Sequence, residues 1–255
     1  YSITQTPLNE QDLKTMSEAV EVLRQFKGFS YFTEMSDIIN RLEDHVASAR
    51  MKTTPVIDFE KNESLKGLDY LDTIYHAIVN EHPIQLKYRS FKARSANSFI
   101  FYPYLLKEYR NRWFVYGVRG NGRILQNLAL DRIQSLEVLP QEHYIKNTFF
   151  DPNTFFDDLV GVTKNTGSVA EKVGFKVAAA EAPYIITKPI HRSQQVMERL
   201  ADGSVILEIE VVINHELERV FFGYAEGIQV LYPKTLVELM GRKLKKAAEQ
   251  YTHSK

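Results

Sequence analysis

The chain contains no cysteine and no long apolar run, and its charges cancel. Without cysteine, disulfide bridges, thiol catalysis and thiolate-bound zinc are excluded. No apolar segment approaches the roughly 20 residues of a membrane-spanning helix, and the N-terminus shows no signal-peptide pattern, so we expect a cytoplasmic protein. Lysine plus arginine number 32, as do aspartate plus glutamate. This balance argues against binding duplex nucleic acid by net charge alone.

Motifs that would indicate an enzyme are also missing. The seven histidines are scattered, and none stands in a His-x-x-x-His or Glu-x-x-His pair with metal-ligand spacing. The phosphate-binding glycine loops and the Gly-x-Ser-x-Gly nucleophile motif are absent as well. We therefore expect no enzymatic activity, no metal and no cofactor.

At 255 residues the chain is long enough for two domains, and its 44% hydrophobic and 25% charged residues are typical of a globular protein. Residues 1–67 predict a helical connector. Apolar positions recur there at helical spacing from Leu13 to Phe26 and from Ile38 to Val46, without a sheet of their own to cover. We expect these faces to form a dimer interface.

Residues 68–140 predict one helix followed by a small antiparallel barrel. The helix is expected from Leu68 to Asn80, and the alternation of Ile84, Leu86 and Tyr88 with polar residues indicates the first strand. Short strands of this kind suit an SH3-like or Sm-like barrel that closes on itself and so removes its edges. Further strands are expected at about 98–106, 112–119 and 123–138.

Gly120-Asn121-Gly122 predicts a hairpin turn between two of these strands, because glycine and asparagine tolerate positive φ. Asn111 is expected to separate the preceding pair of strands in the same way.

The rest of the chain predicts a linker and a second domain. Residues 141–168 are rich in glycine, proline and asparagine but carry phenylalanines, which is typical of a linker with hydrophobic anchors. Residues 169–255 interleave strands and helices, which indicates a ferredoxin-like α+β domain. The overall fold class is therefore α+β. The expected strands are 172–180, 204–213 and 228–232, with a strand and a turn over 189–200. The expected helices are 215–226 and 234–251, with a short helix or a turn over 181–188.

Four motifs in the barrel stretch stand out: Tyr88-Arg89, Pro103-Tyr104-Leu105, Trp113-Phe114-Val115 and Leu130-Asp131-Arg132-Ile133. Their order and spacing resemble the WYL domain, a small sensory barrel of bacterial transcriptional regulators. In that family the signature strand carries Trp-Tyr-Leu, and the sheet closes with an Asp-Arg-Ile-like element. Phe114 replaces the tyrosine here, so the hydroxyl of that position is missing.

The C-terminal part resembles the extension that follows WYL domains in the same regulators. Three motifs carry this likeness: His191-x-Ser193-Gln194, Asn214-His215-Glu216-Leu217, and Gly227 followed by Val230, Leu231 and Pro233. The two resemblances together cover about residues 68–255.

Arginine and aromatic side chains gather within the 45 residues from Tyr88 to Arg132. Arginine forks bind phosphate and aromatic faces stack on bases, so the pattern favours a nucleotide or a short single-stranded oligonucleotide as ligand. For each aromatic residue a place in the sheet core is favoured over ligand binding. For Arg132 at the barrel rim ligand binding is favoured, although Asp131 fits the neutralisation of its charge. The expected ligand-binding residues are Tyr88, Arg89, Arg112, Trp113, Tyr116, Arg119, Arg123, Asn127 and Arg132.

In the second domain His191, Ser193 and Gln194 form a further constellation. Ser193 suits the cap of a turn, and neither an acidic partner nor a nucleophile elbow accompanies His191. A structural role is favoured over catalysis, and a contact to a ligand or to a neighbouring barrel stays open.

The family resemblance implies a non-enzymatic, ligand-sensing regulatory protein that forms a homodimer and has a winged-helix DNA-binding domain upstream of Tyr1. An anionic effector would favour one arrangement of the domains, and the connector would transmit this bias to the DNA-binding domain. Two alternatives stay open: a dimerisation module without a small ligand, and an Sm-like RNA-binding protein.

We expect this chain alone not to bind duplex DNA tightly, because its net charge is zero and no segment predicts a recognition helix with clustered basic residues. In a fluorescence-anisotropy titration with duplex DNA at physiological salt, half-saturation should lie above about 1 µM, in the range of non-specific binding. Submicromolar, sequence-specific binding would place a DNA reader within this chain.

Overall fold

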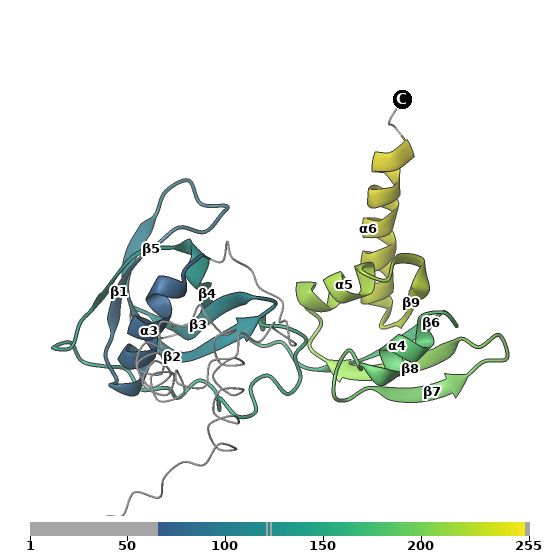
Figure 1. The fold of residues 1–255 in the computed structure, drawn as a ribbon, viewed down its shortest axis with the longest axis horizontal. Helices are drawn as coiled ribbons and strands as arrows, with labels where there is room; N and C mark the ends of the chain where they lie inside the picture. The colour runs from purple at the N-terminus through teal and green to yellow at the C-terminus, as the bar shows by residue number, and fades with distance from the viewer. Residues whose placement is uncertain (1–65, 121, 123, 253–255) are drawn as a thin grey trace, which may run out of the picture. The chain divides into compact units, whose positions relative to one another are not determined.

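The computed structural model describes residues 66–120, 122 and 124–252. The chain divides into two units, Tyr1–Asn147 and Thr148–Lys255 (Figure 1). Each unit has its own hydrophobic core. The expected connector helices and their dimer interface fall on residues 1–65, outside the described residues.

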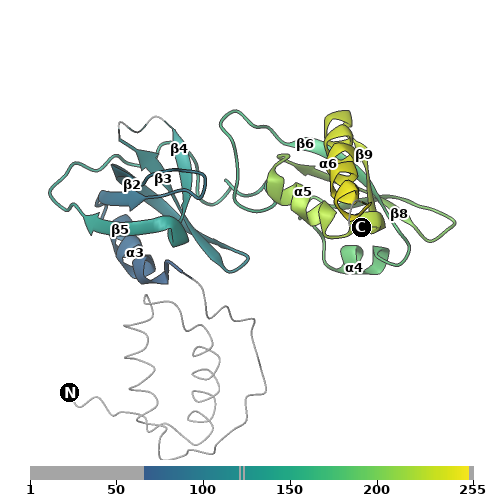
Figure 2. The same cartoon turned by 90° about the horizontal axis from the view of Figure 1, so that it is seen from above.

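The first unit contains one helix and a five-stranded antiparallel sheet. A 3-10 turn, Leu68–Tyr70, leads into α3 (Leu71–Val79), which lies against the sheet in both views (Figures 1 and 2). Neighbouring strands hydrogen-bond in the order β4-β3-β2-β1-β5. The strands are β1 (Ile84–Tyr88), β2 (Asn97–Tyr109), β3 (Arg112–Arg119), β4 (Leu125–Ala129) and β5 (Ile133–Val138).

Sequence periodicity accounts for the core of this unit. Ile84 and Leu86 on β1 are fully buried while Lys87 between Leu86 and Tyr88 is exposed, so the predicted alternation is confirmed. Leu71 and Ile74 present the apolar face of α3 to the same cluster. Each such side chain contributes about 1.5–3 kcal/mol by burial, which is enough to hold a short helix that would be marginal alone.

The expected continuous strand over residues 123–138 is wrong. A 3-10 turn, η4 (Leu130–Arg132), separates β4 from β5. Leu130 is fully buried in this turn and joins the core of the first unit, and the chain resumes as β5 at Ile133.

The expected closure of the barrel is not found in the backbone pairing. Within the described residues, β4 and β5 are the two edges of the sheet, and no ladder joins them. The η4 turn connects these edges covalently instead.

Both predicted hairpin turns are present. Gly120 and Gly122 have φ values of 59° and 70° between β3 and β4, in the left-handed region that glycine tolerates. Between β2 and β3, Arg110 and Asn111 have φ values of 51° and 59°. Two successive residues with positive φ define the tight turn that matches the twist of paired strands.

The second unit has the βαββαβ order of a ferredoxin-like fold, followed by one further helix. Its antiparallel sheet has the strand order β7-β8-β6-β9, which confirms the predicted fold of this part. Residues of all three helices join the core on this sheet, and α6 continues past it toward the C-terminus (Figure 1). The elements are β6 (Glu171–Val177), α4 (Ala182–Thr187), β7 (Gln195–Arg199), β8 (Val205–Val211), α5 (His215–Phe222), β9 (Ile228–Tyr232) and α6 (Lys234–Thr252).

The segment expected as a linker, residues 141–168, is attached to both units. The Tyr144 hydroxyl donates to the Pro103 carbonyl of β2, so the beginning of the segment belongs to the first unit. Val160 lies in the core of the second unit. The division between the units falls inside this segment.

Asn214 connects the end of this segment to α5. Its Oδ1 accepts a hydrogen bond from the Leu217 amide at 2.9 Å, which caps the helix. Its Nδ2 donates to the carbonyls of Val160 and Thr163, both at 3.0 Å. Asn214 is only 7% exposed, so little water is available to replace the hydrogen bonds that its side chain makes to these backbone groups.

In the described part of the chain, no helix is both long and apolar enough to span a membrane.

We expect Asn214→Ala to destabilise the second unit by about 2–4 kcal/mol, because a helix cap is lost and two buried carbonyls lose their donor. Trp113 is the only tryptophan, so its fluorescence reports the first unit while far-UV circular dichroism reports both. Chemical unfolding should therefore show an earlier dichroism transition and an unchanged fluorescence transition. Asn153→Ala, in an exposed turn with Asp151, is the control. A loss below about 0.5 kcal/mol would show that the cap is dispensable.

Candidate functional site: an arginine cluster at the turn between β4 and β5

The η4 turn carries the two charged residues of the Leu-Asp-Arg-Ile motif. Leu130 is fully buried and anchors the turn, whereas the Asp131 side chain is 12% exposed and the Arg132 side chain 27% exposed. Asp131 Oδ2 lies 3.2 Å from Nε of Arg112, the first residue of β3. Its Oδ1 lies 3.9 Å from Nε of Arg132. One carboxylate therefore sits between two guanidinium groups.

The end of β1 is fastened to the same turn. The Arg89 amide donates to the Arg132 carbonyl at 3.1 Å. Tyr88 is half-buried beside Arg132. Burial raises the pKa of the Tyr88 hydroxyl, and it outweighs the positive charge of Arg132 and the hydrogen bonds from Ala129 and Arg132, which act in the other direction. Tyr88 is therefore protonated at neutral pH and offers a hydroxyl rather than a second anion.

Phe91 belongs to this cluster and was missed by the sequence reasoning. Its ring is 73% exposed, and the Arg132 guanidinium carbon lies 4.5 Å from the ring centroid, in cation–π geometry. The exposed Lys92 and Arg94 follow in the same loop between β1 and β2. The available signal was an aromatic residue among basic ones just after a strand, in Arg89-Ser-Phe-Lys-Ala-Arg94.

The structure separates the other expected ligand-binding residues along and across β3. Side chains alternate between the faces of a strand, so Trp113 and Tyr116 point to opposite faces. Trp113 packs against the core of the first unit, and Tyr116 is 2% exposed and pairs with Asn127 on β4. Arg119 stands at the far end of β3 from Arg112, with its guanidinium carbon 3.9 Å from the centroid of the Phe99 ring. Arg123 lies outside the described residues.

The residues brought together are therefore Tyr88, Arg89, Arg112 and Arg132, with Asp131 and Phe91 added. Arg89 joins this cluster through its backbone, while Arg112 and Arg132 contribute two guanidinium groups beside one hydroxyl, one exposed ring and one internal carboxylate. Arginine binds carboxylate or phosphate through charge-assisted hydrogen bonds, so the chemistry that the cluster supports is anion binding.

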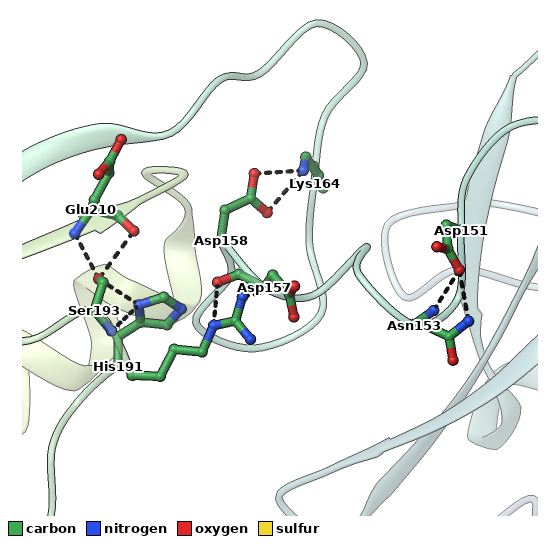
Figure 3. A network of polar contacts seen from close by, with 9 residues as sticks. Asp151, Asn153, Asp157, Asp158, Lys164, His191, Ser193 and Glu210 are labelled. Carbon is green, nitrogen blue, oxygen red and sulfur yellow. Dashed lines mark hydrogen bonds and ion pairs between the residues drawn. The ribbon is translucent and has the colours of Figure 1, made fainter.

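The second expected constellation is built into the second unit (Figure 3). Ser193 Oγ accepts a hydrogen bond from the Glu210 amide of β8 at 2.8 Å and lies 2.7 Å from Nδ1 of His191. Because His191 Nδ1 also accepts from the Ser193 amide at 3.2 Å, the ring proton belongs on Nε2. Gln194 accepts from the Ile190 amide and donates to the Ile185 carbonyl of α4. These three side chains hold the α4–β7 loop to its neighbours.

A charged network next to this loop also serves the fold (Figure 3). Arg192 Nη2 lies 2.7 Å from Asp157 Oδ2, and Arg192 Nε donates to the Asp157 carbonyl at 3.2 Å. Lys164 Nζ contacts both carboxylate oxygens of Asp158, at 2.7 and 2.8 Å. The Arg192–Asp157 pair attaches residues 157–164 to the α4–β7 loop, and the Lys164–Asp158 pair closes this segment on itself. Among the described residues, no three histidine, aspartate or glutamate side chains are grouped to hold a metal ion.

We expect the second unit to lose stability below about pH 6.5 through His191. Burial lowers the pKa of His191, so the imidazole is neutral in the fold while the unfolded chain takes up a proton near its ordinary value of about 6.5. The contribution of neutral His191 to the free energy of unfolding is therefore complete above the pKa of the unfolded chain. It is lost as the pH falls from there through the lower pKa of His191 in the folded protein. Thermal unfolding followed by circular dichroism between pH 5 and about 7.5 should show a smaller pH dependence for His191→Gln. The exposed His143 provides the control variant His143→Gln.

Comparison with protein families agrees with this architecture. The WYL domain model matches residues 69–138, and the WCX domain model matches residues 170–248. A small sheet that presents arginines at a turn, followed by a ferredoxin-like unit, is thus a WYL domain followed by a WCX domain. The chain therefore contains a WYL domain and a WCX domain, and the domain resemblance read from its motifs is confirmed.

Solved structures that are similar to the chain include the following two. Proteasome accessory factor B/C (PafBC) of Arthrobacter aurescens has 15% sequence identity and a TM-score of 0.29, over 75% of this chain and 28% of that one. A CRISPR Cas-related protein has 10% identity and a TM-score of 0.49, over 99% of this chain and 88% of that one. The chain thus spans little more than a quarter of the length of the first. No curated protein matches the sequence.

Proposed function

We propose that this chain is the ligand-sensing part of a WYL-type transcriptional regulator and that its effector is an anion, a nucleotide or a short single-stranded oligonucleotide. The observation that carries the proposal is the convergence of Arg112 and Arg132 on one carboxylate at a turn that the buried Leu130 holds in place. The chain is neutral overall, but this cluster has an excess of positive charge.

Accessibility supports anion binding at the cluster. The Arg112 side chain is 45% exposed and the Arg132 side chain 27% exposed, so solutes reach both guanidinium groups. Phe91 adds an exposed ring beside Arg132, and stacking of a base on an aromatic side chain contributes about 1–3 kcal/mol. A ligand that combines phosphate with a base uses both features.

The turn is also connected to the rest of the first unit in a way that suits signalling. A Cβ atom on Gly67 would lie only 2.4 Å from the Leu130 carbonyl carbon, so the chain that enters α3 passes directly against the η4 backbone. A shift of the turn therefore acts on the segment that precedes α3. In this proposal that segment carries the effect to a DNA-binding domain upstream, within a homodimer. A ligand drives such a shift only through its different affinity for the two states.

We expect Arg132→Ala to weaken binding of a short single-stranded oligonucleotide by roughly 10- to 150-fold, because a charge-assisted, partly desolvated contact contributes about 1.5–3 kcal/mol. The melting temperature should change little, because the Asp131–Arg132 contact at 3.9 Å is too long for a hydrogen bond and Asp131 keeps its closer partner Arg112 at 3.2 Å. Anisotropy titrations and thermal unfolding measure the two effects.

Arg119→Ala is the matched control, because Arg119 also stacks on a phenylalanine but stands at the other end of β3. Binding should survive this change. A sharp fall in melting temperature for Arg132→Ala with unchanged affinity would show that Arg132 is structural. If nucleotides neither copurify with nor bind to a stable dimer, the chain is instead a dimerisation module without a small ligand.

A further inference from the structure

Asp131 occupies the place that an anionic ligand would need. Its carboxylate lies between the guanidinium groups of Arg112 and Arg132, with closest atom pairs at 3.2 and 3.9 Å. It is mostly buried, whereas Arg112 is nearly half exposed. An effector that binds both arginines must therefore compete with a carboxylate that belongs to the protein.

The internal pairing is incomplete. Asp131 Oδ1 and Arg132 Nε are both buried and have no hydrogen-bond partner. They face each other at 3.9 Å, which is too long for a hydrogen bond. A buried polar atom without a partner costs free energy, so the contact between Asp131 and Arg132 is a weak one. An oxygen of a ligand placed against Arg132 Nε would supply the missing partner.

We propose that Asp131 is an intramolecular competitor that holds the effector's anion position in the free protein and thereby sets the charge the effector must carry. The inference rests on the proposed function, because it concerns the same site. A group tethered next to its partner acts at a millimolar or higher effective concentration. A ligand with a single negative charge replaces the contact of the Asp131 carboxylate with a similar contact of its own. Such a ligand therefore gains little binding free energy.

A doubly charged terminal phosphate behaves differently. It offers two charges and three acceptor oxygens, so it can satisfy both guanidinium groups and Arg132 Nε after Asp131 has moved away. Asp131 is therefore a specificity-determining residue that favours ligands with a terminal phosphate over singly charged ones. Because Asp131 follows Leu130 in the η4 turn, its displacement also moves the backbone that abuts Gly67.

The test compares the wild-type chain with Asp131→Asn, which keeps the shape of the side chain and removes its charge. The probes are two 3′-fluorescein-labelled thymidine trinucleotides, one with and one without a 5′-phosphate, titrated by anisotropy at constant salt. Asp131→Asn should bind the unphosphorylated probe roughly three- to tenfold more tightly than the wild type does. The preference for the 5′-phosphate should shrink at the same time.

Glu142→Gln is the control for charge, because it removes one negative charge, as Asp131→Asn does, but at an exposed position after β5. If it tightens binding as much as Asp131→Asn, the effect is one of net charge and the inference is overturned. Asp131→Ser provides a second variant should the asparagine side chain disturb the turn, and it should give the same direction of change.

The remaining outcomes separate this inference from the proposed function. If Asp131→Asn binds no more tightly than the wild type while Arg132→Ala still abolishes binding, Asp131 only positions the arginines, and the proposed function stands without the competitor. If neither the wild type nor Asp131→Asn binds either probe, both fall. If the wild type binds only the phosphorylated probe and Asp131→Asn binds both, the competitor is strong and both are supported.

Discussion

The burial of Leu130 in the core of the first unit is the constraint on which the arginine cluster depends. The chain turns over Leu130–Arg132 and resumes as β5 at Ile133, so both charged residues of the motif lie on a turn that the core holds in place. Asp131 is mostly buried and lies 3.2 Å from Arg112, and Arg132 lies over the ring of Phe91. The apolar anchor and the contacts of the charged groups together position the cluster.

The two units use their charges in different ways. In the second unit, Arg192 pairs closely with Asp157, and Lys164 pairs with Asp158. In the first unit, the pairing around Asp131 is uneven, with one contact at 3.2 Å and one at 3.9 Å. The longer contact leaves two buried polar atoms, Asp131 Oδ1 and Arg132 Nε, without a hydrogen-bond partner, which costs free energy.

Much of the fold could be predicted from the sequence because local patterns carry it. The alternation at Ile84, Leu86 and Tyr88 and the glycines of the β3–β4 turn indicated strands and a hairpin that the structure contains. In the second unit every expected strand and helix is present. The strand over residues 123–138 was wrong because Leu130 satisfies a strand pattern and a buried turn equally well, and only the surrounding core distinguishes the two.

The composition of the candidate site was visible in the sequence, but its geometry was not. The residue types by themselves determined that an arginine-rich and aromatic stretch lies in a neutral, cysteine-free chain, and that its motifs are those of a WYL domain. The predicted strand over 112–119 already placed Trp113 and Tyr116 on opposite faces, and Arg112 and Arg119 at opposite ends. Tertiary structure alone decided that Asp131 lies between Arg112 and Arg132 and that Phe91 joins Arg132. The physical reason is that a side chain's face depends on strand register and on bends in the backbone, which are set by packing between residues far apart in the chain.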